Sequence, residues 1–146
     1  MKLVYPIEIE ELTPEDGGGL LVHFPDWGGA VTEGDDRDEA LANAADCLEE
    51  LVADRINRRE DLPAPSPPRG RPTVALPGRM AGKAALWLAL RERGVSLNEL
   101  ARRLGQPSTL QVRRLLDPKR HSRADLLDEA LAALGKRLAV EVQDAA

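Results

Sequence analysis

The chain has 146 residues, of which 42% are apolar and 3% aromatic, and its formal net charge is −5, so it fits one ordinary domain or two small ones. It has no apolar run long enough to cross a membrane, and its first residues lack the apolar core of a secretory signal peptide. A single cysteine excludes an internal disulfide and fits a reducing cytoplasm, so we expect a cytoplasmic protein. One cysteine and two distant histidines cannot form a zinc site of the usual spacing. We therefore expect no bound metal or other cofactor.

The first 60 residues predict a small unit in which one helix covers a sheet. Alternating apolar residues and glycine-rich turns indicate three strands. These strands are expected over residues 3–12, 20–24 and 30–32. A long helix follows, because Asp36 can cap its N-terminus with Glu39 at the capping-box position, and apolar residues recur at helical spacing from there on. Pro6 indicates a bend or a sheet edge in the first strand.

A proline-rich segment follows this unit. Residues 63–72 contain five prolines, which favours an extended, semi-rigid linker. Three strands and one helix are close to the lower limit for independent stability, so a fourth strand is expected over residues 73–76. We therefore place a first domain, of β-β-β-α-β order, over residues 1–77 and a second domain over residues 78–146.

Residues 94–118 have the pattern of two short helices joined by a tight turn. Ser96 and Glu99 form a capping box for the first helix. Gly105 ends that helix where a positive φ is needed, and Pro107 prevents its continuation.

The second helix of this pair presents polar residues outward. It is expected to begin at Ser108 or Thr109. Its apolar side comprises Val112, Leu115 and Leu116. Its outer side comprises Gln111, Arg113 and Arg114. Together with the small Ala101, which allows the two helices to cross closely, this arrangement is typical of a helix-turn-helix. The alternative is an ordinary helical hairpin whose arginines form a solvated face.

Further elements complete the second domain. A helix over residues 83–93 precedes the pair, and a basic loop over residues 119–123 and a helix over residues 126–134 follow it. Residues 137–143 then alternate as a strand. Because a lone strand in a helical domain lacks a partner, we expect it to pair with its copy in a second subunit. The sequence thus predicts an α+β protein whose second domain is all-α apart from a terminal β-strand.

The charges divide the chain into two halves of opposite sign. Residues 1–62 hold 17 acidic and five basic side chains, a net charge of −12, and residues 63–146 hold eight acidic and 15 basic side chains, a net charge of +7. The basic half suits a polyanion such as nucleic acid, whereas the acidic half suits a basic protein. This division favours the helix-turn-helix over an ordinary helical hairpin.

Two parts of the sequence resemble the HicB antitoxins. Residues 24–51, FPDWGGAVTEGDDRDEALANAADCLEEL, resemble the family signature, in which a Phe-Pro-Asp strand end leads through a glycine turn into a Gly-Asp-capped helix. Residues 77–105 and 112–142 resemble the C-terminal helix-turn-helix half of the same family. The resemblance covers nearly the whole chain, with both halves in the family's order.

The resemblance implies both a fold and a function. The N-terminal domain would have a partial ribonuclease-H-like fold that binds and blocks HicA, a small basic toxin that cleaves mRNA. The C-terminal domain would form a dimer or a higher oligomer, bind double-stranded operator DNA and repress the operon. A cationic toxin needs an anionic inhibitor, which agrees with the charge division found from the residues alone.

Two positions depart from the family pattern. Gly28 stands where the family usually has proline, which loosens the turn after Trp27. The turn over residues 105–111 is one residue longer than the usual spacing between its glycine and the valine of the second helix. We therefore leave open which residue begins the recognition helix, and hence which side chains meet base edges.

The candidate DNA-binding residues lie on the second helix of the pair and in the loop after it. An arginine there can bind a guanine through two hydrogen bonds or hold a phosphate. The candidates are Ser108, Thr109, Gln111, Arg113, Arg114, Arg120 and Arg123. His121 lies among them, and Arg102 and Arg103 on the first helix are candidates for contact with the DNA backbone.

The candidate toxin-binding residues lie in the acidic half. Trp27, in a loop flanked by glycine, either anchors a partner or caps the core of the sheet. The acidic face of the long helix either meets a basic toxin or keeps the helix soluble. The candidates are Asp26, Trp27, Asp46, Glu49, Glu50 and Asp54.

We expect no enzymatic activity. Ribonuclease H holds metals with clustered carboxylates, but helix capping explains the acids within residues 35–39, and no histidine or lysine stands at a suitable spacing. Two alternatives to an antitoxin remain. One is a stand-alone helix-turn-helix regulator whose N-terminal domain senses a ligand or a protein, and the other is a metal-dependent nuclease.

Overall fold

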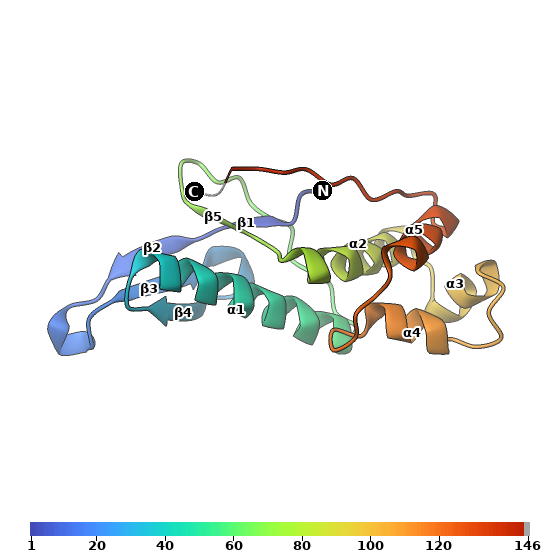
Figure 1. Ribbon diagram of the computed structural model, residues 1–146, viewed down its shortest axis with the longest axis horizontal. Coiled ribbons are helices and arrows are strands. Elements are labelled where there is room, and N and C mark those ends of the chain that lie inside the picture. The colour runs from blue at the N-terminus through green and yellow to red at the C-terminus, as the bar shows by residue number, and fades with distance from the viewer. Residues whose placement is uncertain (145–146) are drawn as a thin grey trace. The chain divides into compact units, whose positions relative to one another are not determined.

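The computed structural model describes residues 1–144, which contain five short strands and five α-helices (Figure 1). The chain divides into two units. The first comprises residues 1–52 and 63–77 and contains the five strands, whereas the second comprises residues 53–62 and the residues from 78 onward. The mixed α and β composition predicted from the sequence, with strands in a small N-terminal part, is therefore confirmed.

The first unit contains two small antiparallel sheets. In one of them, β1 (Val4–Pro6) pairs with β5 (Thr73–Ala75), which is the fourth strand expected after the linker. The other has the order β2-β3-β4, with β2 at Glu8–Glu11, β3 at Leu20–Phe24 and β4 at Ala30–Gly34. The single strand expected over residues 3–12 is split at Ile7, whose backbone N–H donates to the carbonyl of Pro72 at 2.9 Å. The two halves of that segment therefore pair with different strands.

Helix α1 (Arg37–Asn57) begins where the sequence predicts. Asp36 Oδ1 accepts a hydrogen bond from the backbone N–H of Glu39 at 2.9 Å, and Glu39 Oε2 accepts one from the N–H of Asp35 at 2.8 Å. Gly34 lies so close to the start of α1 that a Cβ there would stand 2.3 Å from the backbone nitrogen of Ala40, so a larger residue does not fit. The buried residues of α1 are Ala40, Ala44, Leu48, Val52 and Ile56, and the first four share the core of the first unit with Tyr5, Ile7, Val22 and Phe24.

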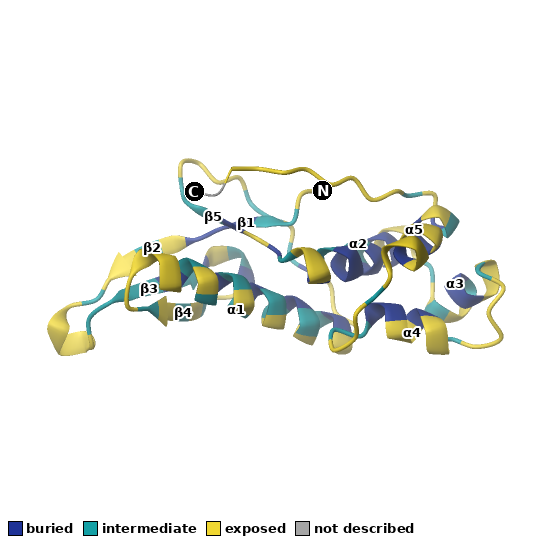
Figure 2. Cartoon of the chain, in the orientation of Figure 1, coloured by how far each residue is buried: buried dark blue, intermediate teal, exposed yellow. Residues whose placement is uncertain are grey.

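Helix α2 (Gly78–Arg93) is the most buried helix of the second unit (Figure 2). It begins five residues before the helix expected over residues 83–93. The other helices of this unit are α3 (Leu97–Arg103), α4 (Leu110–Leu116) and α5 (Ala124–Ala133). Both α4 and α5 pack against α2, and α3 packs against α4 and α5. Gly82 allows a close approach, because a Cβ there would lie 2.7 Å from Leu127 Cδ1.

Residues 53–62 pack with the second unit, although the sequence pattern predicts that they belong to the first domain. The indole N–H of Trp87 donates to the carbonyl of Glu60 at 2.8 Å, and Arg91 Nε donates to Asp61 Oδ1 at 2.6 Å. The guanidinium groups of Arg59 and Arg91 lie 5.8 and 5.5 Å from the centroid of the Trp87 ring. These contacts hold the segment against α2.

In the single chain residues 137–143 form no strand, whereas the sequence predicts a strand there that pairs with its copy in a second subunit. A strand needs a partner whose backbone N–H and C=O groups it can bond, and the described part of the second unit offers none. Val140 and Val142 are accordingly 84% and 94% exposed. The alternating pattern is present in the sequence, but the described part of the second unit contains no strand with which this segment could pair.

Candidate nucleic-acid interface

The turn between α3 and α4 has the local geometry that the sequence predicts. Ser96 Oγ accepts a hydrogen bond from the N–H of Glu99 at 3.1 Å and so caps α3. Gly105 has a φ of +67°, in the left-handed region that glycine adopts without strain. Helix α4 begins at Leu110, whose backbone N–H donates to Ser108 Oγ at 3.3 Å. The second helix therefore begins one residue after the later of the two starts expected from the sequence, with Thr109 as its N-cap.

Helix α4 divides its side chains between core and solvent as predicted. Its buried residues are Val112, Leu115 and Leu116. Its residues Gln111, Arg113 and Arg114 are exposed. Because the apolar side packs within the helical unit, the arginines are left on the outer surface.

Two open grooves beside α4 bring together five of the seven DNA-binding candidates. The central groove, of about 210 Å³, is lined by Leu110, Arg113, Arg114, Asp117 and Arg120. The loop groove, of about 290 Å³, is lined by residues that include Gln111, Arg114, Arg120, His121 and Arg123. Arg114 and Arg120 line both grooves, so the two form one continuous surface. Ser108 and Thr109 line neither groove.

Arg113 and Arg114, the α4 arginine pair, form no ion pair with any acid in the part of the chain that the structure describes. By contrast, Arg120 lies 3.5 Å from Asp117, and Arg123 Nε donates to Asp125 at 3.1 Å. These last two pairs are solvent-exposed and hence weak, so their arginines can exchange the carboxylate for a phosphate. The uncompensated positive charge of this surface therefore rests on the α4 arginine pair.

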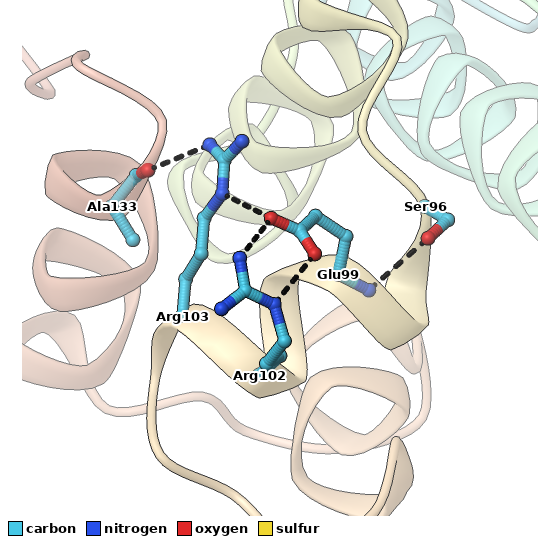
Figure 3. Close-up of polar contacts among 5 residues, drawn as sticks. All are labelled: Ser96, Glu99, Arg102, Arg103 and Ala133. Carbon is cyan, nitrogen blue, oxygen red and sulfur yellow. Dashed lines mark hydrogen bonds and ion pairs between the residues drawn. The ribbon is translucent and has the colours of Figure 1, made fainter.

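Arg102 and Arg103, the α3 arginine pair, are arranged differently (Figure 3). The Glu99 carboxylate accepts hydrogen bonds from Arg102 at 2.7 Å and from Arg103 at 3.0 Å. Arg103 also donates to the carbonyl of Ala133 at 3.2 Å. The bonds from Arg102 and Arg103 lower the pKa of Glu99 to about 2. The α3 pair is thus partly neutralised by one carboxylate, and Arg103 is also bonded to the end of α5, although the Arg102 side chain is 74% exposed.

Lys83 is a residue of this region that sequence reasoning missed. Its side chain is 2% exposed, and its ammonium group donates to the carbonyl of Leu115 at 2.9 Å and to Ser122 Oγ. Burial lowers the pKa of Lys83, and the nearby Asp117 carboxylate opposes that shift. Lys83 therefore connects α2 both to the end of α4 and to the loop over residues 119–123.

The sequence did contain a signal for Lys83. It stands four residues before Trp87 and seven before Leu90, on the buried side of α2. Lysine is seldom fully buried unless its charge has partners. A lysine in the middle of an apolar helix face therefore indicates that polar groups of the fold converge on it.

Two toxin-binding candidates, Asp26 and Trp27, lie in a short 3-10 turn at Pro25–Trp27. Trp27 is 6% exposed, with its ring centroid 5.3 Å from that of Tyr5, so it caps the core of the first unit. Asp26 Oδ2 accepts a hydrogen bond from the backbone N–H of Ser66, at 2.9 Å, in the proline-rich segment. Burial and the Asp26 charge raise the pKa of Tyr5 to about 12.

The other four candidates lie on α1. They are Asp46, Glu49, Glu50 and Asp54. Asp46, Glu50 and Asp54 are exposed and four residues apart, so they follow one line along the helix. Asp54 pairs with Arg58 at 3.0 Å, whereas Asp46 and Glu50 have no basic partner within residues 1–144. This line therefore carries two uncompensated carboxylates.

Within residues 1–144 no group of three or more His, Cys, Asp or Glu side chains could hold a metal ion. His23 Nε2 lies 3.2 Å from Glu10 Oε2 at the surface. Burial raises the pKa of the thiol of Cys47, which is half-buried. The helices of the described residues include none that is long and apolar enough to cross a membrane.

Known proteins match this chain over most of its length. Residues 4–85 match the family model described as HicB-like antitoxin of bacterial toxin-antitoxin system. The chain is 36% identical over 135 residues to Antitoxin HicB 2 of Photorhabdus laumondii, covering 92% of each chain. It is 37% identical over 114 residues to Antitoxin HicB of Pseudomonas fluorescens, covering 77% of each chain. It is 32% identical over 137 residues to Antitoxin HicB of Escherichia coli K12, covering 93% of this chain and 96% of the relative. The chain therefore belongs to the HicB antitoxin family.

Proposed function

We propose that this chain is an antitoxin and autorepressor. Its first unit binds and neutralises a small mRNA-cleaving toxin of the HicA type, and its second unit binds operator DNA and represses the operon. Membership of the family, whose curated relatives are named antitoxins, supports the first role. The charge division, −12 over residues 1–62 against +7 over residues 63–146, supports a cationic partner for one half and a polyanion for the other.

For the DNA-binding role we propose that α3, the turn after it and α4 act as a helix-turn-helix, with α4 as the recognition helix. The observation that carries this proposal is the exposed and uncompensated α4 arginine pair. Arginines on a recognition helix read guanine through two hydrogen bonds, whereas arginines in a neighbouring loop suit phosphates. Arg113 and Arg114 fit the first task, and Arg120 and Arg123 beside them fit the second.

For the toxin-binding role we propose occlusion without catalysis. The first unit would correspond to part of a ribonuclease-H-like fold and would cover the RNA-binding surface of the toxin. Its uncompensated carboxylates, Asp46 and Glu50, give α1 a face to which basic side chains are attracted. Glu49 and Asp54 extend that face, and Asp26 offers a separate acidic contact at the 3-10 turn, whose Trp27 is buried in the core of the first unit.

We also propose that the second unit self-associates through residues 137–143. Pairing of this segment with its copy would bond its backbone groups and cover Val140 and Val142, both exposed in one chain. A dimer would present two α4 helices, as a two-part operator requires. A monomeric mass in solution at micromolar concentration would contradict this.

Co-expression of the chain with the open reading frame beside its gene tests both roles. We expect a small basic protein to co-purify with it. In a gel shift on the DNA upstream of the gene at two salt concentrations, the chain should bind, and the binding should weaken at the higher concentration. Failure to co-purify would contradict the antitoxin role, and failure to shift the DNA would contradict the repressor role.

A further inference from the structure

A third groove lies beside α4, and no candidate DNA-binding residue other than Arg113 lines it. We name it the α1 groove, because it includes two residues from the end of α1 and the segment after it. Its volume is about 370 Å³, larger than either groove described above. It is lined by Asn57, Arg59, Arg113, Leu116, Asp117 and Lys119, which all belong to the second unit.

The α1 groove and the loop groove lie on opposite flanks of α4. Successive residues of an α-helix are rotated by about 100°. This rotation places Arg113 and Leu116, which line the α1 groove, on one flank, and Gln111 and Leu115, which line the loop groove, on the other. Arg113 and Asp117 also line the central groove. The three grooves therefore follow one another around the exposed side of α4.

The α1 groove is positively charged. Arg59, Arg113 and Lys119 face a single acid, Asp117, whose carboxylate is engaged by Arg120 at 3.5 Å and by the backbone N–H of Lys119 at 3.0 Å. Among the described residues, Lys119 and Arg113 form no ion pair. The groove therefore has an excess of positive charge that the protein does not compensate, together with the neutral amide of Asn57.

Arg59 is held in place by the structure around it. It has a φ of +61° just after α1, and its backbone N–H donates to the carbonyl of Ile56 at 3.1 Å. Its guanidinium group lies over the ring of Trp87 and also donates to the Ile56 carbonyl, at 3.4 Å. Such a side chain loses little conformational freedom when it binds an anion.

We propose that the α1 groove binds a phosphate of the DNA backbone, with Arg59, Lys119 and Asn57 as the contacts. The proposal rests on the DNA-binding role proposed for α4. A recognition helix in the major groove lies between two phosphate backbones. The loop groove then meets one backbone and the α1 groove meets the other, so residues encoded in the acidic half of the sequence take part in DNA binding.

Salt-dependent DNA binding by full-length variants tests this proposal. Arg59→Gln and Lys119→Gln each remove one charge from the groove. Arg91→Gln is the matched control, since Arg91 also lies over Trp87 but does not line the groove. The probes are the DNA upstream of the gene and a scrambled duplex of the same length. Thermal unfolding followed by circular dichroism shows whether each variant is folded.

We expect Arg59→Gln and Lys119→Gln each to weaken binding several-fold on both duplexes and to reduce the slope of log affinity against log salt by about 1. Arg91→Gln should leave the slope unchanged. Wild-type slopes in both groove variants would overturn the α1 groove while leaving the role of α4 intact. Absence of any binding by the wild-type chain would overturn both.

Discussion

Helices α3 and α4 have the same length, and each contains two adjacent arginines, yet the two helices offer different surfaces to a polyanion. Each has seven residues. In α3, Glu99 accepts hydrogen bonds from both Arg102 and Arg103. In α4, no acid in the described residues pairs with Arg113 or Arg114. The count of basic residues along the sequence does not distinguish these helices, whereas the partners of those residues do.

On the DNA-binding role proposed above, this difference favours α4 over α3 as the helix that contacts DNA. A cation that already has a carboxylate partner must give it up to bind a phosphate, so it gains less from the exchange. Glu99 stands in the first turn of α3, where its backbone N–H donates to Ser96 Oγ, and its carboxylate accepts hydrogen bonds from the two arginines that follow it.

The largest effect is expected from removing the α4 arginine pair. Arg113→Ala and Arg114→Ala should each weaken operator binding by about 1–3 kcal/mol if the side chain reads a base, and the double variant should abolish the gel shift. The matched control is the double variant Arg102→Ala, Arg103→Ala, which should bind operator with a smaller loss. Equal losses in the two double variants would contradict the contrast.

Lys83→Met should have the next largest effect. The substitution keeps most of the side-chain length but removes the donor to the Leu115 carbonyl, at a cost of about 1 kcal/mol in the free energy of unfolding. Because the loop over residues 119–123 is then less well positioned, operator affinity should fall several-fold at a temperature where the variant is still folded.

Lys136→Met provides the control for Lys83→Met, since Lys136 also forms a polar contact, at 2.8 Å, but with Glu92 of α2 and not with a residue of α4. It should leave operator affinity unchanged. If Lys83→Met lowered the unfolding free energy without changing operator affinity, Lys83 would have a structural role only.

Glu99→Gln should leave the α3 arginine pair without its acidic partner, as in α4. Loss of the carboxylate charge releases the α3 arginine pair, so affinity for a scrambled duplex should rise modestly, together with the slope of log affinity against log salt. Anisotropy of a labelled duplex measures both quantities. Weaker binding by this variant would indicate instead that Glu99 holds the α3 arginines in a conformation that DNA needs.

The stability conferred by Glu99 should depend on pH. Its pKa is about 2 in the folded chain against an ordinary value of 4.5, so the folded state binds this proton less tightly than the unfolded state. The stabilisation is therefore fully present above pH 4.5 and is lost as the pH falls toward 2. The unfolding free energies of wild type and Glu99→Gln should differ at neutral pH and converge within that range. A difference that does not change across that range would contradict the Glu99 pKa.

Features that depend on neighbouring residues could be predicted from the sequence. The Ser96 cap, the left-handed Gly105 and the buried side of α4 each follow from residues within a few positions of one another. The same holds for the start of α1 at Asp36 and Glu39. Local hydrogen bonds and helical periodicity determine these features, so a single sequence is sufficient.

Features that depend on distant partners could not be predicted. The role of Lys83 requires the Leu115 carbonyl and Ser122, over 30 positions away. Residues 53–62 join the second unit through Trp87 and Arg91, which helix periodicity cannot indicate. The terminal strand was predicted from alternation alone, but pairing decides whether alternating residues form a strand.

Amide hydrogen exchange of the full-length chain, with and without the DNA upstream of its gene, tests most directly whether α4 is the DNA-binding helix. We predict slower exchange on addition of DNA in α4 and in the loop over residues 119–123, and a smaller change in α3. Protection of α3 with none in α4, or no change in either helix although the DNA is bound, would contradict the account.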